Sequence, residues 1–346
     1  MGSVLGVAGA QPSEKTNEPK LDAHYSEEVD DRHSGCSQWI LQSVVFPLLL
    51  PKMDDRRVEQ MIKEDAANGP VTTPQHLKLR FDLSMLEGAA CRTHVLKAKN
   101  EARVVLFYLH GGAYISNFVV PMHFDAVADI ADIVSKGHVT SYLLEYPRCP
   151  SVNHKDLFDI VEAVFRRVAE LHPEVPIVVA GDSTGAGMAL VLAQRLVAAK
   201  KGGDDGVKQP ASLVLLSPWL DVSMSAADYK PHSDLDPMLT VQGLQTCGKL
   251  LAGDGAASVP TTHSAVSPLF GSLQDLPPVS VFTSTHDLLI LDAKRLRDRV
   301  KAEGSQGVFR YREKTGLLHC FFLMPAPGSR ETLEEVAAII RADCSL

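Results

Sequence analysis

The sequence predicts an α/β fold in which a mostly parallel sheet is covered by helices on both faces. Short apolar runs of strand character alternate with longer runs whose apolar residues recur every three or four positions. That alternation is typical of parallel sheets whose strands are joined by helices. A glycine-flanked turn at residues 181–185, between one such strand and the next helix, agrees with it. In a sheet of this kind the active site lies beyond the carboxyl ends of the strands.

The individual elements follow from these patterns and from the Gly- and Pro-rich stretches between them. We expect strands at residues 76–81, 91–98, 103–110, 138–146, 176–182, 212–221, 279–285 and 308–313. We expect helices at residues 122–135, 153–171, 184 to about 200, 291–304 and 330–342. Residues 1–35 are mostly polar, which predicts a disordered tail. Between residues 222 and 265 the alternation breaks down, and we interpret this stretch as an insertion that folds over the site.

The composition argues against several classes of function. With 45% hydrophobic and 22% charged residues, the chain can bury a large core. The net charge of −8 argues against a nucleic-acid partner, so small or neutral molecules fit better. Six cysteines without a pairing pattern favour reduced thiols and a cytoplasmic location. The longest apolar run, residues 39–50, is shorter than the ~20 residues that span a bilayer, so we expect no transmembrane span.

Ser183 is the first candidate catalytic residue. It stands in the stretch "GDSTG", with one glycine two positions before it and another two positions after it. A turn of this type holds the serine in a strained conformation with its hydroxyl exposed, which is the geometry of a nucleophile elbow. The five residues also fit an ordinary glycine-rich turn, so the interpretation depends on finding the other parts of a serine site.

A loop that can hold an oxyanion is the second candidate feature. The strand at 103–110 leads into Gly111, Gly112 and Ala113, whose small size lets backbone N–H groups turn toward a common point. The N–H of Thr184 is the natural third donor, and the positive end of the following helix points the same way. The alternative is a simple turn at the end of a strand.

The acid and the base are expected in the chain order Ser, acid, His that is usual for this type of sheet. His319, in "TGLLHCFFL", follows the last expected strand, and Asp287, in "VFTSTHDLLILDA", ends the strand before it. Asp287 would hold the imidazole tautomer while His319 takes the proton from Ser183.

Neighbouring titratable residues are assigned supporting roles. We expect His286 to point away from the acid and Asp292 to cap or orient the helix that follows. We expect His110 to brace the oxyanion loop and Asp182 to support the turn through backbone hydrogen bonds. Cys320 has no base of its own, so we do not expect a thiol nucleophile.

Motifs for cofactors and metals are missing from the sequence. It contains no P-loop, "GAGMAL" lacks the third glycine of a dinucleotide fingerprint, and no cluster of Cys and His suggests zinc. We therefore expect neither a cofactor nor a metal.

Six stretches together resemble, in this order, the hormone-sensitive-lipase-like family of α/β-hydrolases. They are "HGGAY", "GDSTGAG", "LLSPWLD", "SPLFGSLQDLPP", "HDLLILD" and "GLLHCFF". The resemblance covers about residues 77–346. It implies an α/β-hydrolase fold, with a mostly parallel eight-stranded sheet flanked by helices and a helical cap.

The resemblance also implies the role of each site residue. The nucleophile is Ser183, the acid Asp287 and the base His319. The oxyanion donors are the backbone N–H groups of Gly112, Ala113 and Thr184, with Gly111 shaping the loop.

The resemblance further divides the chain into a cap and a core. The cap consists of residues 36–65 and 222–265, and the catalytic core of residues 66–221 and 266–346. Within the cap, the apolar run at 39–50 would guide a lipophilic substrate or touch a membrane surface. The alternative is that it packs its apolar face on the core.

Four features depart from the family pattern. Ala113 replaces the last glycine of H-G-G-G, and Thr184 replaces a usual alanine and sets a branched polar side chain beside the acyl pocket. The segment "EYPRCPSVNH" differs from the usual D-Y-R-L-A-P-E, and the second acidic residue after the acid is displaced to Asp292.

The resemblance implies hydrolysis of short- to medium-chain carboxylic esters, and we expect small, lipophilic substrates and an acyl-enzyme. Two alternatives stay open: a small-molecule receptor without hydrolytic activity, and a lyase or acyltransferase that uses the same site.

Overall fold

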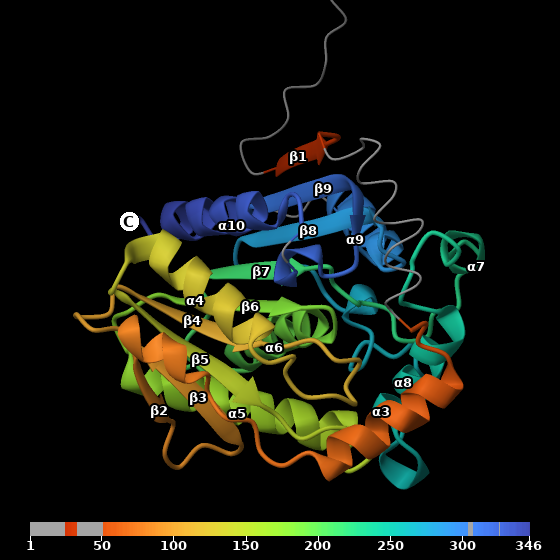
Figure 1. The fold of residues 1–346 in the computed structure, drawn as a ribbon, viewed down its shortest axis with the longest axis horizontal. Coiled ribbons are helices and arrows are strands. Elements are labelled where there is room, and N and C mark those ends of the chain that lie inside the picture. Colours follow the sequence, from red (N-terminus) through yellow and green to blue (C-terminus); the bar gives the residue numbers. More distant parts are fainter. Residues whose placement is uncertain (1–24, 33–50, 304–306, 325) are drawn as a thin grey trace, which may run out of the picture.

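The computed structural model describes residues 25–32, 51–303, 307–324 and 326–346. Its centre is a nine-stranded sheet in the order β1-β9-β8-β7-β6-β4-β5-β3-β2 (Figure 1). β3 is antiparallel to both β2 and β5, and all other neighbours are parallel. The structure confirms the predicted mostly parallel sheet, with one strand more than the eight expected.

The strands are β1 (Tyr25–Asp30), β2 (Asp82–Met85), β3 (Arg92–Lys97), β4 (Val104–Leu109), β5 (Val139–Glu145), β6 (Ile177–Asp182), β7 (Ser212–Leu216), β8 (Val279–His286) and β9 (Phe309–Leu318). The α-helices are α3 (Asp55–Ala67), α4 (Met122–Ser135), α5 (His154–Leu171), α6 (Thr184–Lys201), α7 (Tyr229–His232), α8 (Val241–Ala252), α9 (Ile290–Glu303) and α10 (Ser329–Asp343).

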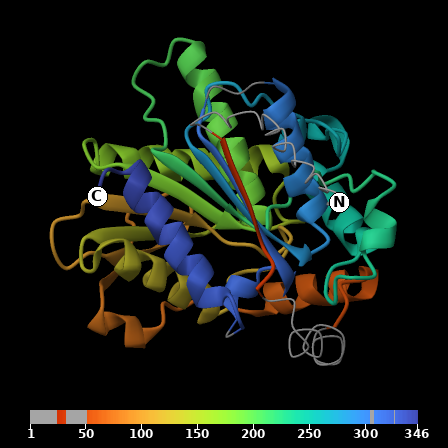
Figure 2. The same ribbon diagram turned by 90° about the horizontal axis from the view of Figure 1, so that it is seen from above.

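The sheet separates two apolar cores. Every residue of the central strands β4 and β6 is buried, which explains why these strands are continuous apolar runs rather than alternating ones. Phe107 and Leu109 of β4 belong to the core that α5, α6 and α9 share. Leu106 and Tyr108, on the other face, belong to the core beneath α4 and α10. These two helices lie together on one face of the sheet (Figures 1 and 2).

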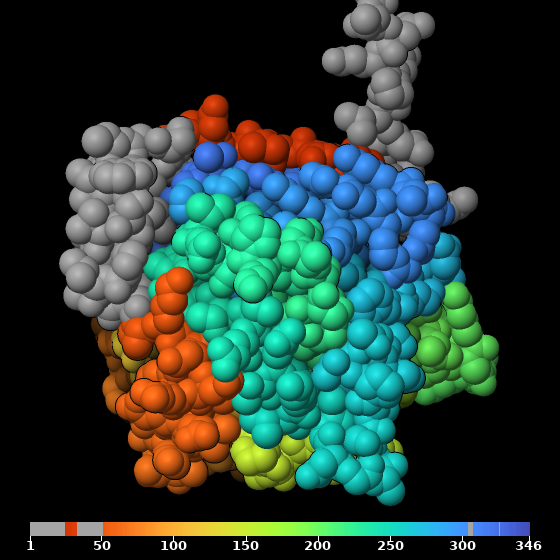
Figure 3. All heavy atoms as spheres, turned by 90° about the vertical axis from the view of Figure 1, so that its right-hand side faces the viewer, coloured from red at the N-terminus to blue at the C-terminus, as the bar shows by residue number. Residues whose placement is uncertain are grey.

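Three further helices, α3, α7 and α8, gather at one end of the sheet, on the right of Figure 1. Figure 3 shows this end of the molecule, where α3 lies beside residues from the stretch 222–265. Hydrogen bonds join the chain just before α3 to this stretch. Met53 N–H donates to Met238 O at 2.7 Å, and the Thr240 side-chain Oγ1 donates to Met53 O at 2.6 Å. Gly243 allows this approach, because a Cβ there would stand 1.9 Å from Met53 O.

The strand expected at residues 76–81 is wrong, because Gln75–Leu79 form a 3₁₀-helix. Leu77 and Phe81 are buried, whereas Leu79 is 86% exposed. The alternating apolar residues in this stretch therefore do not form one face of a strand. Leu77 and Phe81 are buried because they lie about one helical turn apart.

The disordered tail expected at residues 1–35 is wrong for residues 25–30, which form β1. This polar strand pairs in parallel with β9 at the edge of the sheet. Tyr25 stacks on Phe309 with ring centroids 5.9 Å apart. At the other end of β1, Asp30 forms an ion pair of 3.1 Å with the buried Lys314, which also contacts Glu335. An edge strand stabilised by pairing and charge does not require the apolar pattern that predicts strands from sequence.

Part of the segment 36–65 lies outside the described residues, including the apolar run at 39–50. In the described part of the chain, no helix has both the length and the apolar character needed to cross a bilayer.

Asp30→Asn tests the ion pair at the sheet edge. The substitution leaves the buried Lys314 ammonium with Glu335 as its one carboxylate partner among the described residues. We expect the free energy of unfolding to fall by about 1–3 kcal/mol, because a buried charge loses a partner. Chemical denaturation measures this loss, and hydrogen exchange of the β1 amides should rise. The matched control is Glu28→Gln, since Glu28 is 58% exposed and its pair with Arg312 spans 3.4 Å. It should change stability by less than about 0.5 kcal/mol, and an equal loss in both variants would contradict the role given to Asp30.

Candidate active site

Ser183 occupies a strained turn between β6 and α6. Its backbone has φ 52° and ψ −117°, a conformation that L-residues rarely adopt. A Cβ at Gly185 would lie 1.9 Å from Leu109 O, and one at Gly181 would lie 2.5 Å from the backbone of Gly185. The two glycines are therefore needed because the strand, the turn and the helix approach too closely for side chains.

Backbone hydrogen bonds hold the strained serine in place. Ser183 N–H donates to Leu216 O at 2.9 Å, which ties the turn to β7. Its carbonyl accepts from Trp219 N–H at 3.1 Å and from Gly187 N–H at 3.2 Å. The Ser183 side chain faces a cavity at the positive end of α6, a helix of 18 residues.

Asp287 and His319 come together as the chain order predicts. Asp287 directly follows β8, His319 directly follows β9, and Asp287 Oδ2 lies 2.9 Å from His319 Nδ1. Leu289 N–H donates to the other carboxylate oxygen at 2.8 Å. Because the carboxylate can only accept, Nδ1 of the neutral ring carries the proton and Nε2 is the free acceptor. Burial lowers the pKa of His319, but the charge and hydrogen bond of Asp287 outweigh it and hold this pKa well above its usual value.

The Nε2 atom of His319 contacts Cys320 rather than Ser183. The Sγ atom of Cys320 lies 3.3 Å from Nε2, and no hydrogen bond joins Ser183 to His319, although both side chains line the same cavity. The thiol of Cys320 therefore contacts the same imidazole that we predict to be the base for Ser183. The left-handed backbone of Cys320, with φ 52°, turns the thiol back toward the ring that precedes it. Burial raises the pKa of this thiol to about 12, so it stays protonated and can donate to Nε2 when the His319 ring is neutral.

The loop after β4 carries the residues expected to hold an oxyanion. Gly112 has φ 127° and Ala113 φ 55°, so the loop turns tightly. Their N–H groups donate to no acceptor in the described part of the chain, while Gly112 O accepts from Ser116 N–H at 2.9 Å. A Cβ at Gly111 would lie 3.0 Å from Ser183 Cβ and 2.4 Å from Asp182 Oδ2, so the glycine permits the loop to approach the turn. Thr184, the first residue of α6, is fully buried.

Side chains rather than backbone groups surround Asp182, contrary to our expectation. Tyr108 OH donates to Asp182 Oδ1 at 2.7 Å, and His123 Nε2 lies 3.3 Å from Oδ2. Burial raises the pKa of Asp182, but the charge of His123 and these hydrogen bonds outweigh it and lower that pKa overall. The carboxylate of Asp182, at the end of β6, is therefore held as an ionised group next to Ser183 in the chain. The backbone of Asp182 belongs to β6 and pairs with β7, where Leu216 is its partner in the register.

His110 lies beneath the oxyanion loop, where we expect a bracing residue. Its ring stacks on Tyr146 at a centroid distance of 4.2 Å, and Tyr146 OH donates to His110 O at 2.8 Å. His110 Nδ1 is 2.5 Å from Gly111 O. Burial lowers the pKa of His110 to about 3, so this ring is neutral and cannot exchange protons near neutral pH.

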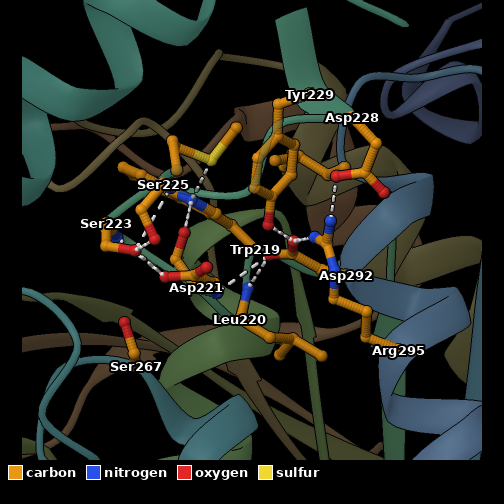
Figure 4. A network of polar contacts seen from close by, with 12 residues as sticks. Trp219, Leu220, Asp221, Ser223, Ser225, Asp228, Tyr229, Ser267, Asp292 and Arg295 are labelled. Carbon is orange, nitrogen blue, oxygen red and sulfur yellow. Dashed lines mark hydrogen bonds and ion pairs between the residues drawn. The ribbon is translucent and has the colours of Figure 1, made fainter.

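Asp292 does not cap its own helix, so the capping half of its expected role (to cap or orient the helix) is wrong. Its buried carboxylate accepts from the backbone N–H groups of Leu220 and Asp221 at 2.7 and 2.9 Å and from Tyr229 OH (Figure 4). It therefore joins α9 to the start of the stretch 222–265. As expected, His286 is not a partner of Asp287: its Nδ1 lies 3.2 Å from Thr285 Oγ1.

The cavity at Ser183 has a volume of about 540 Å³. Its walls come from α3, the segment 238–244, and the loops after β4 and β9. Thioethers and aliphatic groups form much of the cavity lining. They are Met53, Met61, Val119, Met122, Met238, Leu239, Leu244, Leu323 and Met324. Polar side chains from α3 and the oxyanion loop also line the cavity, and they include Arg57, Glu64, Asp65, Asn68 and Asn117. Within the described ranges, no group of three or more His, Cys, Asp or Glu side chains is arranged to hold a metal.

Comparison with known protein families identifies the family of this chain. Residues 106–323 match the family that is described as having the α/β hydrolase fold. The chain belongs to the α/β-hydrolase family. This agrees with the resemblance seen in the sequence, and the matched range includes Ser183, Asp287 and His319.

Two relatives of this α/β-hydrolase show how far the similarity extends. An esterase of Acinetobacter venetianus is 28% identical over 253 residues, covering 72% of this chain and 78% of that protein. An acetyl-hydrolase of Streptomyces hygroscopicus is 26% identical over 249 residues, covering 71% of this chain and 78% of that protein.

Solved structures of esterases share the fold of this α/β-hydrolase. EstE5 soaked with p-nitrophenyl butyrate superposes with a TM-score of 0.70 at 21% identity, covering 90% of this chain and all (100%) of that one. An esterase from the bacterial hormone-sensitive lipase family superposes with a TM-score of 0.65 at 23% identity, covering 84% of this chain and 97% of that one.

Gly185→Ala tests the constraint on the strained turn. The new methyl would collide with Leu109 O, so the turn must shift or the strand must move. We expect a loss of at least about 3 kcal/mol in the free energy of unfolding, or failure to fold. Gly69→Ala is the control, because a Cβ there meets nothing within 4 Å; it should change stability by less than about 0.5 kcal/mol. Chemical denaturation compares the two variants, and a mild effect of Gly185→Ala would contradict the close approach.

Proposed function

We propose that this α/β-hydrolase is a serine carboxylesterase that hydrolyses neutral, short- to medium-chain carboxylic esters. The observation that carries the proposal is the 2.9 Å contact between His319 and Asp287 in the cavity that the strained Ser183 also lines. A buried imidazole whose Nδ1 is held by a carboxylate is suited to accept a proton at Nε2. Similarity to proteins named esterase and acetyl-hydrolase supports the same reaction class.

In the first half of the reaction, Ser183 is the nucleophile. Its Oγ attacks the ester carbonyl carbon while His319 Nε2 takes the hydroxyl proton, and the imidazolium is stabilised by Asp287. The oxyanion accepts hydrogen bonds from the N–H groups of Gly112, Ala113 and Thr184. When the intermediate collapses, His319 gives its proton to the departing alcohol, which leaves an acyl-serine.

In the second half, water replaces the alcohol. His319 takes a proton from the water as it attacks the acyl-serine, and the same N–H groups stabilise the second oxyanion. Collapse of this intermediate releases the carboxylic acid and returns the proton to Ser183 Oγ. In both halves Nε2 must be free to accept, so the thiol proton of Cys320 must turn away from the ring.

The apolar lining of the cavity favours a substrate that carries an acyl chain. Methionine side chains from α3 and the segment 238–244 line the same cavity as Ser183, and thioethers adapt to acyl chains of different shape. The charged groups of the lining already have partners within the protein: Arg57 pairs with Glu64 at 3.1 Å, and Asp65 pairs with Arg148 at 2.6 Å. Because each cation of these pairs has a carboxylate partner, neutral esters fit this site better than anionic ones. By this proposal α3 and the residues from 222 to 265 act as the cap over the substrate.

Ser183→Ala tests the nucleophile. We expect kcat for p-nitrophenyl esters to fall by at least about 10⁴-fold while the fold persists, because a methyl cannot form the acyl-enzyme. The rate is measured across acyl lengths from acetate to laurate, with circular dichroism to check folding. A fluorophosphonate should label Ser183 in the wild-type protein, as mapped by mass spectrometry.

Ser345→Ala is the matched control, because this exposed serine lies outside the proposed cap, does not line the cavity and should leave kcat unchanged. Ester turnover that survives in Ser183→Ala would overturn the proposal. Saturable binding of esters without turnover in the wild-type protein would favour a receptor. Elimination products, or acyl transfer to an alcohol, would favour the lyase or acyltransferase alternative.

The raised pKa of His319 predicts the pH dependence of the reaction. The neutral ring is the active form, so activity is lost as the pH falls through the pKa of the folded enzyme. Because this pKa lies above the ordinary 6.5, the acid limb of kcat/KM should have its midpoint above that value. In Asp287→Asn the residual activity should show a limb at lower pH, because the charge that stabilises imidazolium is gone. Activity that stays constant between about pH 5 and 8 would contradict the role of His319.

A further inference from the structure

A second buried carboxylate, Asp236, lies beside the proposed acid. It belongs to the segment between α7 and α8 and is 1% exposed. Its Oδ1 accepts from the backbone N–H groups of Met238 and Leu239, each at 2.8 Å, and its Oδ2 accepts from Leu288 N–H at 2.8 Å. Nothing in the proposed mechanism uses this residue, yet burying a carboxylate costs free energy unless the charge is stabilised.

The three hydrogen bonds connect two functional parts of the site. Met238 and Leu239 line the cavity at Ser183, whereas Leu288 is the residue that follows Asp287. One carboxylate therefore fixes the apolar wall of the substrate cavity to the loop that carries the proposed acid. Met238 O in turn accepts from Met53 N–H, so the same segment is also bound to the chain at the start of α3.

The charges around Asp236 are those of the proposed triad. Asp287, at the end of β8, and His319, after β9, act on its carboxylate, and no Lys or Arg forms an ion pair with it among the described residues. Burial and the charge of Asp287 raise the pKa of Asp236 to about 6, while the positive charge of His319 acts in the opposite direction. His232 of α7 also lies near Asp287, but burial lowers its pKa and keeps it neutral. Cys320, on the other side of His319, is protonated as described above.

We propose that Asp236 is a positioning residue of the active site, which holds the acid loop against the substrate wall and stabilises the His319 imidazolium as a second negative charge. The inference rests on the proposed esterase function. The charge acts through space on a ring that Asp287 already orients, so Asp236 needs no contact with substrate. The base is then supported by two carboxylates: Asp287 contacts the ring, and Asp236 holds the backbone N–H of the next residue, Leu288.

Asp236→Asn removes the charge and keeps most of the shape. The amide oxygen can still accept from Met238 and Leu239, so the wall of the cavity is retained, while the amide NH₂ faces Leu288 N–H and cannot accept from it. We expect the acid limb of kcat/KM to move to lower pH by on the order of half a unit, because imidazolium loses a stabilising charge. At the pH optimum kcat should fall several-fold, with a smaller change in KM.

Asp292→Asn is the matched control. Asp292 is equally buried and also accepts backbone N–H groups at the edge of the stretch 222–265, but its partners are Leu220, Asp221 and Tyr229, which do not line the cavity (Figure 4). Burial raises the pKa of Asp292 to about 7, so this carboxylate also ionises near neutral pH and its replacement by asparagine removes a comparable charge. This variant tests whether loss of any buried carboxylate in this region changes the profile. We expect no shift of the acid limb.

The experiment records pH profiles of kcat and kcat/KM for p-nitrophenyl butyrate with all three proteins, normalised to active sites by fluorophosphonate labelling. A shift to lower pH in Asp236→Asn alone supports the proposal. An unchanged limb in Asp236→Asn, or an equal shift in Asp292→Asn, overturns it and leaves the esterase assignment intact. Failure of the esterase assignment is recognised separately, because labelling at Ser183 and turnover by the wild-type protein would then be absent.

A measurement on the wild-type protein covers the case in which Asp236→Asn does not fold. NMR of labelled histidine follows the His319 ring, assigned by its loss in His319→Gln. Because a positive imidazolium and a negative carboxylate favour each other's charge, a neighbouring carboxyl that titrates near the same pH broadens the curve beyond a single protonation. A broadened titration of His319 supports the second carboxylate, and a curve that fits one independent protonation overturns it.

Discussion

The contact between the backbones of β4 and α6 is the constraint on which the rest of the site depends. There is no room for a side chain at Gly185, because a Cβ there would lie 1.9 Å from Leu109 O. The backbones of the strand and the helix are therefore in direct contact. That closeness forces Ser183 into its positive φ and keeps its side chain at the cavity. It also sets the loop that follows β4 beside the first turn of α6, so the candidate nucleophile and the candidate oxyanion donors share a single fixed geometry.

Buried carboxylates fix the remaining parts of the site to this turn. Asp182 is held beneath the serine by Tyr108 and His123, and Asp287 holds the imidazole from the end of β8. Each carboxylate is desolvated, and each receives hydrogen bonds or an opposite charge that offset the cost of burial. The loops of this fold vary easily, but loops tied by charged groups to the ends of strands are rigid where the chemistry requires it.

The sequence predicts the parts of this protein that obey local rules. Continuous apolar runs identify β4 and β6, glycine spacing identifies the turn at Ser183, and chain order at the carboxyl ends of the strands brings Asp287 and His319 together. β1 escapes prediction because its stability comes from pairing with a distant strand and from the pair between Asp30 and Lys314. Asp236 escapes for a similar reason: three backbone donors from two separate segments make its environment, and no spacing in the chain records them.

Cys320, the residue that follows His319, occupies the Nε2 atom that the proposed mechanism assigns to Ser183. Its thiol reaches Nε2 of the preceding ring because the residue adopts a left-handed conformation. A thiol is a weak donor, so little free energy is lost when its proton rotates away from the nitrogen. The hydroxyl of Ser183 is a stronger donor on the same cavity wall. In the reaction proposed above, the thiol of Cys320 gives up its contact with the neutral ring to the serine. Asp287 need not move for this exchange, because its hydrogen bond is made to the opposite side of the ring.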